Sequence, residues 1–80
     1  FDQAKPILQK AIKIQPDFVR AHNNLGIVLE ELGQSQKAMS YFQTAIKIQP
    51  NFANAHYNLG NAFNKLNEFK KAIGCYEKAV

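Results

Sequence analysis

The sequence has no tryptophan, one cysteine, three prolines and no long apolar run. Because one thiol cannot form a disulfide within the chain, Cys75 gives no indication of an oxidising compartment. No segment approaches the roughly 20 apolar residues of a transmembrane helix, and the start lacks the pattern of a secretory signal. We therefore expect no membrane partner, and the cytoplasm is the default location.

The residue groupings that carry enzyme chemistry are also missing. There is no glycine-rich phosphate loop and no nucleophile–base pair, and the adjacent carboxylates of Glu30 and Glu31 point in different directions around a helix. His22 and His56 have no second metal ligand at helical spacing, so we expect them to pack and not to bind metal. Cys75 has only lysines nearby and is interpreted as a structural thiol. The sequence predicts a chain that is not an enzyme and has no cofactor or metal.

The net charge of +4 raises the question of a nucleic-acid partner. Arg20 and Lys65 stand apart from the other basic residues, and Glu30 and Glu31 oppose them. The remaining eight fall in segments expected to be the outer helix of each pair: Lys5, Lys10, Lys13, Lys37, Lys47, Lys70, Lys71 and Lys78. This distribution favours a solvated outer face over a phosphate-binding groove, so no nucleic-acid partner is expected.

Apolar residues recur at spacings of three and four, which is typical of amphipathic helices. The pattern predicts five helices, over 1–15, 18–32, 36–48, 53–66 and 69–80, and no strand. Pro16 and Pro50 should each end the helix before them, and Asp17 is a candidate N-cap. Gly33 and Asn67 stand where a left-handed residue closes a helix. Linkers of two to four residues predict antiparallel neighbours. The expected stripes of the second, fourth and fifth helices include Ala21, Leu25, Val28, Leu29, Leu32, Ala55, Leu59, Ala62, Phe63, Leu66, Ala72, Ile73, Tyr76, Ala79 and Val80.

The chain repeats itself after 34 residues. The stretch 21–26, Ala-His-Asn-Asn-Leu-Gly, returns at 55–60 as Ala-His-Tyr-Asn-Leu-Gly, and 16–46 laid over 50–80 matches at eleven of thirty-one positions. This period predicts a helix–turn–helix solenoid. It divides the chain into the second helix of one repeat (1–16), one complete repeat (17–50) and most of a third (51–80). Because the chain opens in mid-pattern, we expect it to come from a longer protein.

Gly26 and Gly60 recur in the middle of predicted helices, where glycine costs about 1 kcal/mol relative to alanine. We expect the paired helix to cross tightly at these glycines. Ala38 and Ala72 would supply the small surface opposite, with aromatic residues filling a wider gap one turn later.

The order Leu-Gly, then alanine twelve residues on, then an aromatic residue, alanine and proline resembles the tetratricopeptide repeat family over all 80 residues. His22 and His56 depart from the large residue that the family often has there. The resemblance implies an all-α fold, a right-handed α-α superhelix of antiparallel helix pairs, whose first helices line a concave groove. It also implies a non-catalytic scaffold that binds a protein or an extended peptide.

By that resemblance, the binding groove is lined by first-helix residues outside the buried stripe. Asn24 and Asn58, equivalent in the repeat, resemble an asparagine ladder that holds a peptide main chain through amide donors and acceptors. The full predicted site comprises Arg20, Asn23, Asn24, Ile27, Asn54, Tyr57, Asn58, Asn61, Asn64 and Lys65, with Glu30 and Glu31 beside them. The family's carboxylate clamp is not expected, because Asn23, Tyr57 and Asn54 stand at the positions expected to hold its lysines.

Two alternatives remain open. Apolar ends of the array, including Ile7, Leu8, Tyr76 and Val80, could stack on another copy and give a head-to-tail oligomer. The chain is also similar to the substrate-recruiting repeat region of some glycosyltransferases, in which case the parent protein is an enzyme.

Overall fold

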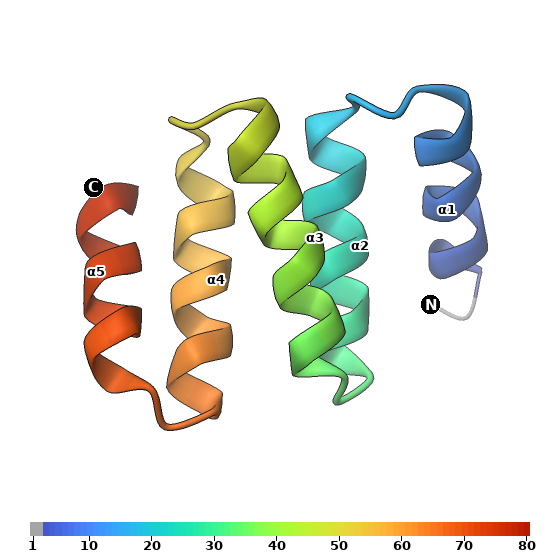
Figure 1. Ribbon diagram of the computed structural model, residues 1–80. Helices are drawn as coiled ribbons and strands as arrows, with labels where there is room; N and C mark the ends of the chain where they lie inside the picture. Colours follow the sequence, from blue (N-terminus) through green and yellow to red (C-terminus); the bar gives the residue numbers. More distant parts are fainter. Residues whose placement is uncertain (1–2) are drawn as a thin grey trace.

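The computed structural model describes residues 3–80, and the expectation of helix at residues 1 and 2 lies outside this range. The described residues form five helices joined by linkers of three or four residues: α1 (Ala4–Ile14), α2 (Val19–Glu31), α3 (Ser35–Ile48), α4 (Ala53–Lys65) and α5 (Phe69–Ala79). Figure 1 shows how they are arranged. The all-α prediction, with five helices in antiparallel succession, is confirmed for these residues.

The helix ends follow the predicted turn chemistry. α1 stops before Pro16, with Gln15 already outside helical geometry at φ −135° and ψ 87°. Gly33 and Asn67 both adopt the left-handed conformation, with φ of 79° and 62°. The next amide along then bonds back to the last turn, Gln34 N to Leu29 O at 2.9 Å, as in a Schellman motif.

The prediction that Asp17 caps α2 is wrong. The N-cap is Phe18. Its backbone is extended (φ −75°, ψ 93°), and its side chain makes no capping hydrogen bond. Its carbonyl instead accepts the amides of Ala21 and His22, at 3.1 and 3.2 Å. Phe52 begins α4 with nearly the same backbone angles, so this entry into the first helix repeats after 34 residues.

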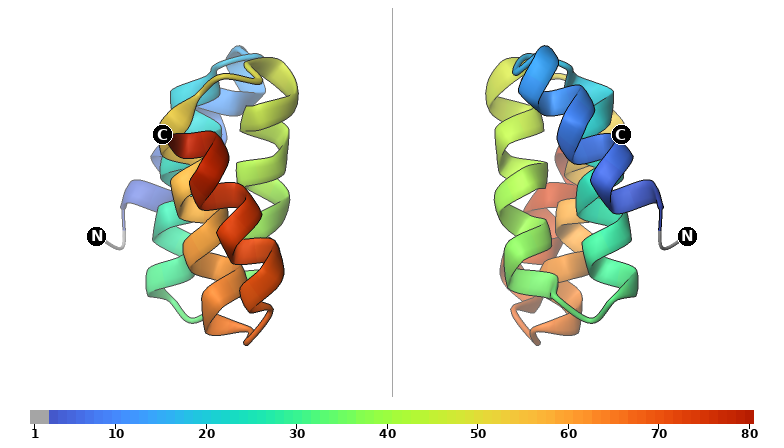
Figure 2. Two further views of the ribbon diagram at one scale, coloured as in Figure 1. Left: turned by 90° about the vertical axis from the view of Figure 1, so that its left-hand side faces the viewer. Right: turned by 90° about the vertical axis from the view of Figure 1, so that its right-hand side faces the viewer.

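The helices pack as successive hairpins in an array of 35 × 25 × 15 Å (Figures 1 and 2). α2 pairs closely with α3 and α4 with α5, while α3 also packs on α4 and α1 on α2. The first helices α2 and α4 touch each other directly. α2 and α4 therefore form one side of the array, and α1, α3 and α5 flank them.

A core of small and large apolar side chains runs through the hairpins. Its buried members are Leu25, Leu29, Ala38, Phe42, Leu59, Phe63, Ala72 and Cys75. Three residues of the predicted stripes are instead exposed: Leu32, Ile73 and Val80, the last residue of the chain. Leu32 is 47% exposed because it is the C-cap of α2, where the chain turns away. Ile73 is 56% exposed because, in residues 3–80, no helix follows α5 to cover it.

The tight crossing at the two glycines exists, but its partner differs from the prediction. A Cβ on Gly26 would lie 2.7 Å from Cδ1 of Phe42, and one on Gly60 would lie 2.7 Å from Cε1 of Tyr76. The aromatic ring therefore lies directly on the glycine backbone, where the sequence had suggested a small alanine. Ala38 is still fully buried one turn earlier along α3.

We predict that Gly26→Ala destabilises the fold by about 1–3 kcal/mol, because the added Cβ would overlap the fully buried Phe42 ring and force the ring or the helix to shift. Gly74 provides the matched control, since it is also helical but a Cβ there would meet nothing within 4 Å. Gly74→Ala should stabilise α5 by up to about 1 kcal/mol through helix propensity alone. Urea denaturation followed by circular dichroism measures both. If the two variants shift stability in the same direction, the ring does not lie on the Gly26 backbone.

Candidate functional site

The two first helices are joined by a hydrogen bond between asparagine side chains. Asn58 Nδ2 on α4 donates to Asn23 Oδ1 on α2 at 3.0 Å. Asn23 is only 5% exposed, so this amide pair lies inside the contact between consecutive repeats. A buried polar pair of this kind stabilises the contact only in one register, because a shift would leave both amides unpaired.

Beside this bond, a groove of about 260 Å³ runs between α2 and α4; we call it the α2–α4 groove. Phe42 lies at its base, and its walls consist of Ile27, Glu30, Glu31, Asn58, Asn61, Asn64 and Lys65. The structure thus brings together five residues of the predicted site together with both glutamates expected beside them.

A tyrosine of the neighbouring helix sets the orientation of Asn61. The Tyr76 hydroxyl on α5 donates to Asn61 Oδ1 at 2.5 Å. This bond leaves the Asn61 amide nitrogen, with two N–H donors, unbonded among residues 3–80. One repeat earlier, the same two positions hold Ile27 and Phe42. The first repeat therefore has an apolar pair where the next repeat has a hydrogen-bonded pair. This paired change is visible in the sequence, but the site prediction missed it.

Glu30 of α2 contacts both α3 and α4. Its Oε1 accepts a short hydrogen bond from Ser35 Oγ and lies 3.7 Å from Lys65 Nζ on α4. The side chain of Glu30 is 12% exposed and that of Lys65 is 59% exposed, so water screens the ion pair and it contributes little. Glu31 is exposed and makes no ion pair within the described part of the chain. The groove is therefore mixed in charge, with a free carboxylate on one wall.

The other five residues of the predicted site lie outside the α2–α4 groove. Asn24 is exposed on α2, and Asn23 is buried in the bond described above. Arg20 and Asn54 are exposed in the first turns of their helices. Tyr57 is 55% exposed and lies against Tyr76, with ring centroids 5.8 Å apart. Asn24 and Asn58 are equivalent in sequence. Asn58 contacts the preceding first helix, α2, and residues 3–80 contain no first helix before α2 for Asn24 to contact in the same way.

Both histidines hold the linker that precedes their helix. His22 Nε2 donates to the Pro16 carbonyl at 2.7 Å, and His56 Nε2 donates to the Pro50 carbonyl at the same distance. Both rings are buried, each 6% exposed. Each bond places the ring proton on Nε2 and fixes the orientation of the ring. Residues 3–80 contain no cluster of three side chains suited to a metal ion. The sequence signal for these bonds is the six-residue spacing from proline to histidine, which occurs twice.

The single thiol is not activated. Burial raises the pKa of Cys75, and the nearby Lys78 lowers it by a smaller amount. The thiolate fraction at neutral pH is therefore below that of an ordinary cysteine. None of the helices found in residues 3–80 combines the length and the apolar run needed to cross a membrane.

Comparison with known proteins agrees with this arrangement. Models described as tetratricopeptide repeat match residues 1–18, 19–52 and 53–80. The chain belongs to the tetratricopeptide repeat family. No curated protein sequence matches the chain at a significant level.

Solved structures share the tetratricopeptide fold. A crystal structure of MamA is 29% identical, with a TM-score of 0.86, over 90% of this chain and 42% of that chain. A second MamA structure reaches a TM-score of 0.89 at 26% identity, over 98% and 45%. YrrB, described as a TPR protein with an unusual peptide-binding site, has the same fold at 24% identity and a TM-score of 0.88, over 90% and 37%. The chain spans less than half the length of these structures. Tetratricopeptide repeats generally serve as protein-interaction modules without chemistry of their own.

The bond between the repeats gives a direct test. We predict that Asn58→Ala destabilises the tetratricopeptide array by about 1–3 kcal/mol, because it leaves the buried Asn23 carbonyl oxygen without a donor. The repeat-equivalent Asn24→Ala should change stability by less than about 0.5 kcal/mol, since Asn24 is exposed. Thermal unfolding followed by circular dichroism compares the two. The double variant Asn23→Ala/Asn58→Ala should lose less than the sum of its single changes; equal melting of Asn58→Ala and Asn24→Ala would contradict the bond.

Proposed function

We propose that this chain is a peptide-binding scaffold and that the α2–α4 groove holds an extended segment of a partner protein. The observation that carries the proposal is the fixed orientation of two amides on α4. Asn58 uses its nitrogen on Asn23, and Asn61 uses its oxygen on Tyr76. Asn58 therefore keeps its oxygen for a donor, and Asn61 keeps its nitrogen for an acceptor.

These two free groups suit a peptide main chain. Asn58 and Asn61 are three residues apart on one helix face, about 4.5 Å along the axis. An extended chain advances about 3.3 Å per residue and exposes one N–H and one C=O in each. A backbone N–H can thus donate to Asn58 while a nearby carbonyl accepts from Asn61. Because their internal partners hold both amides in place, a peptide would find them already oriented.

The remaining groove residues indicate what side chains the peptide would carry. Ile27 is partly buried and offers apolar contact. Glu31 offers a free carboxylate on the same helix, one turn further along. Asn64 is exposed and makes no side-chain hydrogen bond within residues 3–80. An apolar residue followed by a basic one fits this order, with Asn64 as a further main-chain contact. The shared fold with YrrB, a peptide-binding TPR protein, supports the assignment.

A variant that copies one repeat onto the next tests the proposal. Asn61→Ile together with Tyr76→Phe reproduces the Ile27–Phe42 pair, so the packing should be kept while the free amide is lost. Peptides selected from a displayed random library should bind this double variant about three- to tenfold more weakly, the value of a lost hydrogen bond. Asn64→Ala should weaken them further, measured by fluorescence anisotropy.

Asn54→Ala is the matched control, because Asn54 is an exposed asparagine on the same helix outside the groove. It should leave affinity unchanged. If no peptide is enriched, or if the selected peptides bind the Asn61→Ile/Tyr76→Phe variant as well as the original chain, the proposed function is wrong.

Self-association is a second candidate, favoured by apolar side chains on the outermost helices. On α1, Ile7 and Ile14 are 63% and 75% exposed, and on α5, Phe69 and Ile73 are 55% and 56% exposed. Of the end residues named from the sequence, Ile7 and Val80 are exposed, whereas Leu8 and Tyr76 are partly buried. Sedimentation at several concentrations tests this candidate. An average mass that rises with concentration and falls back in Ile73→Glu supports it, and a monomer at high micromolar concentration excludes it.

A further inference from the structure

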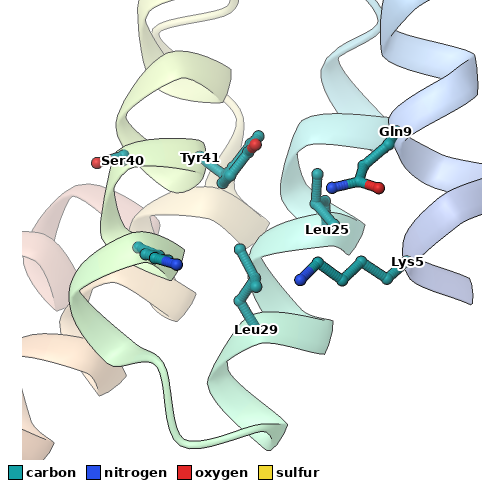
Figure 3. A pocket seen from close by; sticks show the side chains of 7 residues that line it. Lys5, Gln9, Leu25, Leu29, Ser40 and Tyr41 are labelled. Atoms are coloured by element: carbon teal, nitrogen blue, oxygen red, sulfur yellow. The ribbon is translucent and has the colours of Figure 1, made fainter. Parts of the chain in front are cut away.

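The outer side of the array has two grooves of its own, and they repeat with the 34-residue period. One groove, of about 310 Å³, lies between α1 and α3 above Leu25 and Leu29 of α2. Figure 3 shows Lys5 and Gln9 of α1 reaching across it, with Tyr41 of α3 on the other side. We call this the α1–α3 groove.

The corresponding α3–α5 groove, of about 350 Å³, lies between α3 and α5. Its floor is formed by Leu59 and Phe63 of α4, the repeat equivalents of the two leucines below the first groove. Lys37 lines the first groove and Lys71, its repeat equivalent, lines the second. Each groove therefore combines an apolar floor with a lysine at the same place on its rim.

The positive charge of the chain is concentrated on the helices that form these grooves. α1, α3 and α5 together carry eight lysines and one glutamate, Glu77, a net charge of +7. α2 and α4 carry two basic and two acidic residues and are neutral. Lysine and glutamate are about equally suited to exposed helix positions, so helix propensity does not explain this separation of charge. A field of one sign instead attracts a partner of the opposite sign.

The lysines at the groove rims have few or weak internal partners. Lys5 and Lys37 form no ion pair within residues 3–80. Lys71 Nζ lies 3.2 Å from Glu68 Oε1 and 5.7 Å from the centre of the Phe63 ring. Both members of the Lys71–Glu68 pair are largely exposed, so the pair is weak and a ligand carboxylate can replace Glu68.

We propose that the α1–α3 and α3–α5 grooves bind an acidic protein segment in which carboxylate residues alternate with aliphatic ones. The aliphatic side chains would occupy the apolar floors, and the carboxylates would contact Lys37 and Lys71. A nucleic acid would use the charge but leave the apolar floors unfilled. A flat anionic membrane would meet the lysines on the ridges, not those facing into the grooves. This surface is separate from the α2–α4 groove, so it would serve a second partner or a second segment of the same one.

The test uses a fluorescein-labelled peptide of alternating glutamate and leucine, and the same peptide with glutamine in place of glutamate. Binding to the chain is measured by anisotropy at low and physiological salt. Lys37→Gln/Lys71→Gln removes the two equivalent groove lysines. Lys13→Gln/Lys47→Gln is the matched control, because it removes two equally charged, repeat-equivalent lysines from outside the grooves.

The acidic peptide should bind, the glutamine peptide should bind at least about tenfold more weakly, and raising salt should weaken only the former. The groove variant should lose about fivefold or more in affinity and the control variant less than about twofold. Equal losses in both variants would overturn the proposal, since they indicate diffuse attraction. Binding of phosphatidylserine vesicles or a DNA duplex, without binding of the acidic peptide, would also overturn it. Asn61→Ile/Tyr76→Phe should leave this affinity unchanged, which separates the result from that for the α2–α4 groove.

Discussion

The contact on which the structure depends is an aromatic ring lying directly on a helix backbone. In each hairpin, a glycine of the first helix meets the ring of the second, Gly26 with Phe42 and Gly60 with Tyr76. A side chain at either glycine would separate the two helices. The glycine costs helix propensity, but it lets a large ring bury itself completely, as Phe42 does. The rotation of each helix about its axis is thereby fixed, and so is the set of residues left facing the next repeat.

That rotation also determines the α2–α4 groove. With Gly60 held against Tyr76, the next residue, Asn61, comes within reach of the tyrosine hydroxyl, and Asn58 faces α2 and bonds Asn23. The histidine–proline bonds hold the linkers at the start of each first helix, so α2 and α4 enter the array in the same way. Packing, linker and amide orientation are therefore one connected arrangement. Most residues that line the groove are polar, and the apolar side chains buried below it hold them in place.

Local chemistry made most of the fold predictable. The 34-residue period, the prolines and the left-handed Gly33 and Asn67 determine where helices begin and end, and these features act within a few residues. The site was only partly predictable, because it depends on contacts between repeats. Sequence equivalence made Asn24 and Asn58 look alike. Asn58 bonds Asn23 of the preceding first helix, α2, whereas residues 3–80 contain no first helix before α2 that Asn24 could contact in the same way. The apolar stripe of a first helix predicts which face packs on its hairpin partner. It does not predict which residues make the narrower contact with the next first helix.

In the proposed complex, the Asn58 side-chain oxygen and the Asn61 side-chain nitrogen contact a peptide main chain. A titration of the ¹⁵N-labelled chain with a selected peptide, followed by nuclear magnetic resonance of the side-chain NH₂ groups, tests it most directly. We expect the NH₂ signals of Asn61 and Asn64 to shift with bound peptide while those of Asn24 and Asn54 stay in place. Shifts confined to Asn24, or to residues of α1, α3 and α5, would contradict it.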